Sequence, residues 1–160
     1  MITTTLCFLV RDSTVLLAMK KRGFGLGKFN GVGGKLKPGE SISKTAIRET
    51  EEEIFVRIKE SDLKHHATLV FNFDSKPEWN QKCYVFLVNS WEGNPAESEE
   101  MKPEWFPIGA LPFEQMWIDD SHWLPKVLAG LRLEAEFIFD SEGKIIKSKN
   151  VSEVEILSLL

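Results

Sequence analysis

The chain has 160 residues, of which 42% are hydrophobic and 28% charged, and its formal net charge is −4. The hydrophobic fraction excludes a largely disordered chain, and the length suits one hydrophobic core, so we expect residues 1–160 to form a single domain. The net negative charge argues against binding to a nucleic-acid polymer, which requires a basic surface. A small anionic substrate stays open, because a metal ion or a local lysine cluster can reverse the local potential.

The cellular compartment follows from what the sequence lacks. No apolar run approaches the roughly 20 residues that span a bilayer, and the N-terminus has no basic and apolar signal region. The two cysteines, Cys7 and Cys83, stand in strand-like apolar stretches without metal-binding spacing, as buried thiols of a reducing compartment do. We expect a cytoplasmic monomer that does not bind membranes.

The pattern of apolar residues and turn signals predicts the elements in chain order. Strands at 2–10 and 14–20 are joined by a tight turn, the glycine-rich stretch 21–40 has irregular backbone, and 41–54 is a helix. The later predictions are strands at 66–74, 82–91 and 104–108, a loop at 92–103, a helix at 121–130, and a hairpin of 133–139 with 144–148. Strands and helices do not alternate strictly, which favours an α+β fold with a mixed, curved sheet flanked by two helices.

The helix at 41–54 carries an unusual acidic stripe. On a helical wheel, Glu49, Glu52 and Glu53 lie beside an apolar stripe that can pack on a sheet, and Ser41 is a suitable N-cap. Three carboxylates at positions i, i+3 and i+4 can converge on one hard divalent cation such as Mg²⁺ or Mn²⁺. The alternative is a solvated helix face.

The spacing around this stripe decides between the two. The pattern G-x5-E-x7-R-E-x2-E-E runs from Gly34 to Glu53, and six fixed residue types arise by chance only about once in 10⁷ windows. The pattern resembles the Nudix box. This resemblance implies an α/β/α sandwich of the Nudix type and Mg²⁺ as the cofactor, with Mn²⁺ as a substitute. It implies that Arg48 orients a glutamate, and that metal ligands and catalytic groups come from Gly33, Glu49, Glu52 and Glu53.

Two positions depart from the box. Thr50 replaces an aliphatic residue in the apolar stripe, and we expect it to cost some packing. Phe55 stands where the box has glycine, and phenylalanine adopts a left-handed C-cap poorly. We therefore expect a slightly longer helix or a reshaped exit loop.

Other stretches extend the resemblance to a branch of the family. AMKKRGFGLGKFNGVGGK (18–35), the loop around Glu99 to Pro103, WFPIGALPFEQMW (105–117) and WIDDSHWLP (117–125) together are similar to the MutT-type hydrolases of oxidised purine nucleoside triphosphates. The resemblance implies an additional metal-linked glutamate at Glu100. The candidate substrate-binding residues are Thr5, Lys20, Phe24, Asn30, Val32, Gly33, Gly34, Lys35, Phe71, Trp117, Asp119 and Asp120.

Several of these residues suit a purine on chemical grounds. Trp117 offers a flat face for stacking, and Asn30 carries both a donor and an acceptor. If Asp119 and Asp120 share a partly dry pocket, the pKa of one must rise, so that one acid donates a hydrogen bond while the other accepts. The alternative is that this segment is only a helix start, with Asp120 or Ser121 as its cap. Phe71 is either a wall of the base site or a core residue.

The leading hypothesis is Mg²⁺-dependent hydrolysis of oxidised purine nucleoside triphosphates, such as 8-oxo-dGTP and 2-hydroxy-dATP, to the monophosphate and pyrophosphate. A second hypothesis keeps the box but changes the substrate to ADP-ribose, a dinucleoside polyphosphate or another nucleoside diphosphate derivative. A third is a nucleotide-binding module without turnover.

Overall fold

The computed structural model describes residues 1–158, so the last two residues of the predicted 1–160 domain lie outside the described part. The strands are β1 (Ile2–Arg11), β2 (Thr14–Lys20), β3 (Phe29–Asn30), β4 (Lys64–Phe73), β5 (Gln81–Val88), β6 (Met101–Pro107), β7 (Leu133–Phe139) and β8 (Ile146–Glu153). The α-helices are α1 (Ile42–Ile54) and α2 (Asp120–Leu128), and the 3-10 helices are η1 (Glu60–Asp62), η2 (Pro77–Trp79) and η3 (Phe113–Gln115).

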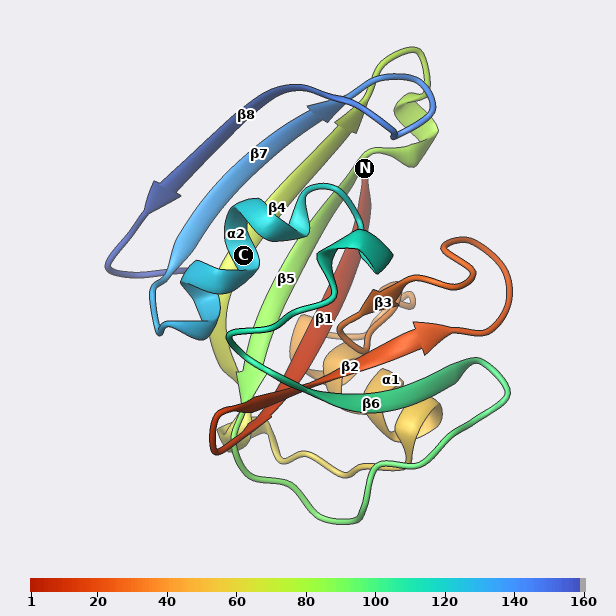
Figure 1. Ribbon diagram of the computed structural model, residues 1–160, viewed down its shortest axis with the longest axis vertical. Coiled ribbons are helices and arrows are strands. Elements are labelled where there is room, and N and C mark those ends of the chain that lie inside the picture. The colour runs from red at the N-terminus through yellow and green to blue at the C-terminus, as the bar shows by residue number, and fades with distance from the viewer. Residues whose placement is uncertain (159–160) are drawn as a thin grey trace.

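The strands form one mixed sheet whose order is β3-β2-β1-β5-β4-β7-β8, with β6 paired to β2 (Figure 1). β1 pairs in parallel with β5 from Ile2 to Leu9, and antiparallel with β2 only at Val10 and Arg11. The sheet therefore divides at β1 into two parts. We call β2, β3 and β6 the short wing, and β5, β4, β7 and β8 the long wing. The mixed sheet predicted from the sequence is confirmed.

The two α-helices cover opposite faces of the sheet, α1 behind it and α2 in front of it in Figure 1. Ala46 of α1 packs in one cluster with Cys7 of β1 and Phe86 of β5. Trp123 of α2 is fully buried on the other face, where its ring meets Phe8 edge-on at 6.0 Å between centroids. This arrangement is the predicted α/β/α sandwich.

Helix α1 begins as predicted, with Ser41 as its N-cap, but its end corrects an expectation. Phe55 adopts the left-handed conformation (φ 60°, ψ 34°), and its N–H donates to the carbonyl oxygen of Glu51. The helix neither lengthens nor lacks its cap, because buried Ile54 and Val56 hold the chain on both sides of the turn. Phenylalanine therefore occupies the glycine position of the box despite its unfavourable backbone energy.

Several predicted boundaries were displaced. β6 begins at Met101, inside the predicted loop 92–103, because Met101 is buried and pairs with Lys20. The short strand β3 lies within the segment 21–40 predicted to be irregular. The closing strand β8 is longer than the predicted 144–148.

Among the helices of the described residues, none is long and apolar enough to cross a membrane.

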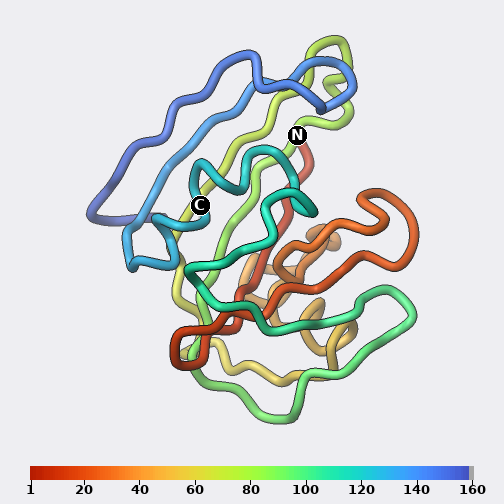
Figure 2. Tube along the Cα trace, viewed as in Figure 1, coloured from red at the N-terminus to blue at the C-terminus, as the bar shows by residue number. Residues whose placement is uncertain are grey.

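The start of α2 also differs from the cap prediction. The helix begins at Asp120, and its N-cap residue is Asp119, whose side chain makes no capping hydrogen bond. Neither Asp120 nor Ser121 is the cap. Figure 2 follows the backbone from the segment after β6 into α2. The loop 21–28 reaches the residue just before this helix start through the ring contact of Phe24 with Trp117.

Candidate active site

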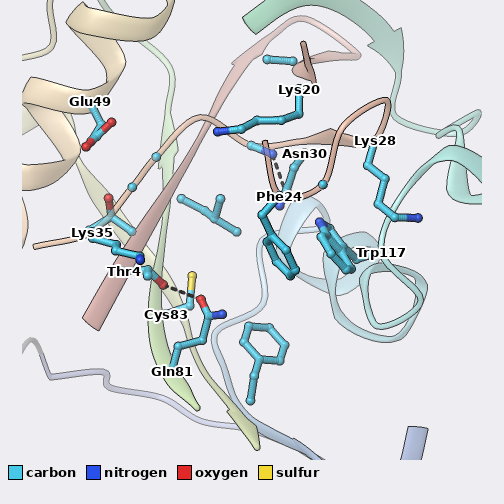
Figure 3. Close-up of a pocket in the computed structure, with 18 of the residues that line it drawn as sticks. Thr4, Lys20, Phe24, Lys28, Asn30, Lys35, Glu49, Gln81, Cys83 and Trp117 are labelled. Carbon is cyan, nitrogen blue, oxygen red and sulfur yellow. Dashed lines mark hydrogen bonds between the residues drawn. The ribbon is translucent and has the colours of Figure 1, made fainter. Parts of the chain in front are cut away.

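A cavity of about 630 Å³ lies between the short and long wings, and most of the predicted site residues line it (Figure 3). The predicted residues along its wall are Thr5, Lys20, Phe24, Asn30, Gly33, Gly34, Lys35, Glu49, Glu53, Phe71, Glu100, Trp117, Asp119 and Asp120. One cavity therefore contains both the residues expected to bind a base and those expected to bind phosphates and metal.

Trp117 forms one side of the cavity and already has ring contacts. The ring of Phe24 stacks on it at 5.0 Å between centroids with 29° between the planes, and the ammonium of Lys28 lies 5.2 Å from the indole centroid. A Cβ added at Gly25 would lie 3.2 Å from the indole, so glycine permits this close approach. The loop 21–28 therefore brings an aromatic and a cationic group to the stacking residue.

Two adjacent buried acids, Asp119 and Asp120, lie next to Trp117. Oδ2 of Asp119 accepts a 2.8 Å hydrogen bond from Nε1 of Trp123, whereas Oδ2 of Asp120 has no hydrogen-bond partner in the described part of the chain. Burial raises the pKa of Asp119, and burial together with the Asp119 charge raises the pKa of Asp120 well above its usual value. The pair can therefore keep a shared proton to higher pH than two exposed aspartates, and so offer one donor and one acceptor to a ligand.

Arg48 on α1 holds the acidic helix and the loop before it together. Its Nε and Nη2 donate to the two carboxylate oxygens of Glu40 at 2.7 and 3.0 Å, and its Nη1 donates to Glu49 at 2.8 Å. These contacts hold the pKa of Glu40 down to about 2. Arg48 thus orients Glu49 from outside the cavity, as the resemblance implied.

Glu49 and Glu53 project from one face of α1 into the cavity. A Cβ added at Gly34 would lie 2.4 Å from Cδ of Glu49, and one added at Gly33 would lie 1.7 Å from the carbonyl oxygen of Thr5. Burial, followed by the charge of Glu49, raises the pKa of Glu53 to about 8. Gly34 therefore lets the loop backbone approach the Glu49 carboxylate closely, and Gly33 lets it approach the backbone of β1 at Thr5.

Glu100, the residue immediately before β6, lines the same cavity as these acids. It accepts hydrogen bonds from Lys20 at 3.3 Å and from Arg22 at 3.2 Å. Lys21 ties the same loop down, with Nζ donating to the carbonyl oxygen of Ser98 at 2.7 Å. The basic run 20–22 therefore holds Glu100 beside the cavity.

The residues present fit a divalent cation. Oε2 of Glu53 is buried and has no hydrogen-bond partner within residues 1–158, and a cation beside it would remove the cost of that burial. The donor set of carboxylate oxygens is the one that Mg²⁺ prefers. No three acidic, histidine or cysteine side chains among the described residues already form a metal cluster, since Arg48 and Lys20 hold Glu49 and Glu100.

Three predicted residues do not line this cavity. Val32 is buried in the core, Arg48 acts from behind Glu49, and Glu52 lines a neighbouring depression together with Glu100 and Phe55. Glu52 therefore does not join Glu49 and Glu53 in the cavity wall; its carboxylate accepts a 3.2 Å hydrogen bond from Nη1 of Arg48, the same group that donates to Glu49. The hydroxyl of Thr5 is buried and without a hydrogen-bond partner in the described chain.

The structure adds residues that sequence reasoning missed. They are Thr4, Leu6, Lys28, Gln81, Cys83 and Met101, all of which line the cavity. Most of them lie on β1 and β5. Their meeting in one cavity depends on the pairing of these two strands, which brings together residues about 80 positions apart in the sequence. Trp123 is fully buried, and its hydrogen bond to Asp119 was not anticipated from the sequence.

Comparisons with known proteins agree with this geometry. The chain matches the NUDIX domain family over residues 2–127. It is 42% identical over 153 residues to an oxidized purine nucleoside triphosphate hydrolase of Danio rerio, with 96% of each chain covered, and 38% identical over 151 residues to the protein of that name in Mus musculus, with 94% of each covered.

Among solved structures, the crystal structure of a mutator MutT protein from Bacillus halodurans superposes with a TM-score of 0.79 at 27% identity, covering 94% of this chain and 97% of that one. The box pattern on α1, the sandwich around it and these similarities agree, and the chain belongs to the NUDIX domain family of hydrolases.

Proposed function

We propose that the protein hydrolyses oxidised purine nucleoside triphosphates, such as 8-oxo-dGTP and 2-hydroxy-dATP, to the nucleoside monophosphate and pyrophosphate. The observation that carries this proposal is that Trp117, Asp119 and Asp120 share one cavity with Glu49 and Glu53. A nucleotide can therefore place its base and its phosphates on the two groups at once. The names of the relatives from Danio rerio and Mus musculus support the same substrate class.

At the base end, recognition needs a stacking surface and a choice of hydrogen bonds. Trp117 supplies the surface, worth about 1–3 kcal/mol per base. The Asp119/Asp120 pair supplies a donor and an acceptor, and moving its proton from one acid to the other changes which base edge fits. Asn30, whose Oδ1 accepts from Gly31, keeps its amide hydrogens for the ligand.

At the phosphate end, charge and backbone converge. Lys20 and Lys35 bring positive charge, and the Gly33-Gly34 backbone lines the cavity beside the Glu49 carboxylate. Glu49, Glu53, Glu100 and the Gly33 backbone would hold Mg²⁺, or Mn²⁺ in its place, with Glu52 reaching the site from the neighbouring depression. When bound, the metal would neutralise the triphosphate and acidify the attacking water.

The chain's own part in the reaction is to orient and to accept a proton. Glu53 or Glu52 accepts the proton of a water molecule that attacks the β-phosphorus. The bond between the β-phosphorus and the oxygen that bridges it to the α-phosphorus breaks. The nucleoside monophosphate leaves with that oxygen, and pyrophosphate keeps the oxygen of the water. We propose that the protein does this as a cytoplasmic monomer, without binding nucleic-acid polymers or membranes.

A substrate panel tests the proposal. Pyrophosphate release and kcat/KM are measured with 8-oxo-dGTP, 2-hydroxy-dATP, dGTP and ADP-ribose in the presence of Mg²⁺. We expect the oxidised purines to have the highest kcat/KM. A highest value on ADP-ribose would favour the second hypothesis, and binding without turnover under any divalent cation would favour the third. The same panel is run on Glu53→Gln, which lacks the proposed proton acceptor and should lose most of the turnover. Glu51→Gln, on the exposed side of α1, is its control.

A further inference from the structure

Two polar side chains stand on the otherwise largely apolar floor of the cavity. The hydroxyl of Thr4 on β1 donates a 3.1 Å hydrogen bond to Oε1 of Gln81 on β5, and Figure 3 shows the pair below the cavity. Both side chains are partly buried, and the neighbouring floor residues are Cys83, Phe71 and Phe73. None of the roles derived above uses Thr4 or Gln81.

The position of the pair is between the two ends of the site. Thr4 forms a β-bridge with Lys35, which belongs to the phosphate end. Gln81 is paired in the sheet with Phe71, which belongs to the base end. In a bound nucleoside triphosphate, the part between the base and the phosphates is the sugar.

The hydrogen-bonding capacity of the pair suits a hydroxyl. Thr4 uses its hydrogen on Gln81, which leaves the oxygen of Thr4 as an acceptor and the amide nitrogen of Gln81 as a donor. A sugar hydroxyl both accepts and donates, so it can bond to the two at once, whereas a phosphate would leave the threonine acceptor unmatched. The sheet does not need this bond, since eight paired positions already join β1 to β5.

We propose that Thr4 and Gln81 form a subsite that binds a hydroxyl of the nucleotide sugar and thereby contributes to substrate selection. The proposal rests on the proposed function, since it assumes a nucleotide lying between Trp117 and the acidic helix. The 2′- and 3′-hydroxyls share the required chemistry, and the substrates below separate them.

The test compares three triphosphates with the same 8-oxoguanine base: the ribonucleotide, the 2′-deoxyribonucleotide and the 2′,3′-dideoxyribonucleotide. Wild type, Thr4→Val and Gln81→Leu are assayed for kcat/KM, and the matched control is Gln115→Leu, an exposed glutamine of η3 outside the cavity. In the wild-type protein we expect kcat/KM to fall about three- to tenfold when the substrate lacks the sugar hydroxyl that Thr4 and Gln81 bind. This factor is the value of one neutral hydrogen bond.

In Gln81→Leu and Thr4→Val, the ratio of kcat/KM between the substrates with and without this hydroxyl should fall to near one. Gln115→Leu should keep the wild-type ratio. A step between the deoxy and dideoxy substrates assigns the 3′-hydroxyl, and a step between the ribo and deoxy substrates assigns the 2′-hydroxyl. The proposal is overturned if both variants lower kcat/KM equally on all three substrates, or if the step survives in both.

Binding gives a second measurement that does not need turnover. Calorimetric dissociation constants of the three corresponding monophosphates should show the same step in wild type and the same loss in the two variants. If no triphosphate is hydrolysed but this pattern is present, the proposed function fails and the subsite stands. If hydrolysis occurs without the pattern, only the subsite fails.

Discussion

The indole nitrogen of Trp123 donates a 2.8 Å hydrogen bond to Oδ2 of Asp119, and both side chains are buried. An indole N–H is a donor only, so this oxygen of Asp119 must act as an acceptor. The shared proton of the acid pair is therefore displaced toward Asp120, whose pKa is the more strongly raised. Because Trp123 also packs edge-on against Phe8, the hydrophobic core holds the Asp119 carboxylate in place.

The first prediction concerns the stability of Asp120→Asn. Burial keeps Asp120 protonated in the folded protein to a higher pH than in the unfolded chain. Its contribution to stability is therefore fully present below the ordinary aspartate pKa and is lost as pH rises toward the folded value. Asparagine has no such loss. We expect the two proteins to have similar melting temperatures near about pH 4, and the variant to be more stable near about pH 8.

Thermal unfolding across this pH range measures the difference, with about 2–4 °C expected for each kcal/mol. Asp12→Asn, in the exposed turn between β1 and β2, is the control for a charge removed elsewhere. If the difference in melting temperature between wild type and Asp120→Asn does not change with pH, Asp120 has the same pKa in the folded and unfolded states, and the prediction is wrong.

The second prediction is that Glu53→Gln has opposite effects on activity and stability. Loss of the carboxylate should lower kcat by about 10²–10⁴, the contribution of a positioned proton acceptor. In the metal-free protein the same change removes a buried acid with a raised pKa and an unpaired oxygen, so the melting temperature should rise. Mg²⁺ should then stabilise wild type more than the variant. A lower melting temperature without metal would contradict this account.

The third prediction concerns Gly33 and Gly34, in the loop that lines the cavity. Neither residue has a positive φ, so glycine is needed there for lack of space and not for backbone conformation. Gly34→Ala should fold, because the flexible end of Glu49 can move away from the new Cβ, but that movement should lower kcat by about a hundredfold. Gly33→Ala should lose stability, since its Cβ would collide with the backbone of Thr5. Melting temperatures and kcat are compared with Gly109→Ala, where the new Cβ meets nothing within 4 Å.

Local patterns in the sequence predicted most of this arrangement. The apolar and acidic stripes correctly indicated α1, and the mixture of strands and helices indicated a mixed sheet. What local patterns could not predict depends on distant pairing. The parallel contact of β1 with β5 brings Thr4 to Gln81, and it was not visible in either segment alone. Helix α1 ends at Ile54, as the predicted range 41–54 had it, but the left-handed C-cap at Phe55, between buried Ile54 and Val56, was not anticipated.

The fourth prediction separates binding from chemistry at Trp117. Trp117→Ala removes the stacking surface, so we expect KM to rise about 10- to 100-fold with little change in kcat, and selectivity for oxidised bases to weaken. Steady-state kinetics on 8-oxo-dGTP and dGTP measure this split. Trp91→Ala, which removes an indole stacked on Trp105 outside the cavity, is the control. A fall in kcat with unchanged selectivity would refute the stacking role.

The last prediction addresses the left-handed residue at the end of α1. A non-glycine residue in this conformation costs about 1–2 kcal/mol, whereas glycine adopts it freely but loses about 0.5–1 kcal/mol more conformational entropy on folding. Phe55 is 55% exposed, so its ring contributes little burial. Phe55→Gly should therefore stabilise the protein by about 0.5–1 kcal/mol. Urea denaturation measures it, with Phe55→Ala as the control that removes the ring but keeps the backbone strain. Because Glu53 precedes the turn, kcat should be unchanged. If Phe55→Gly is less stable than Phe55→Ala, the turn is held by the surrounding fold at no backbone cost.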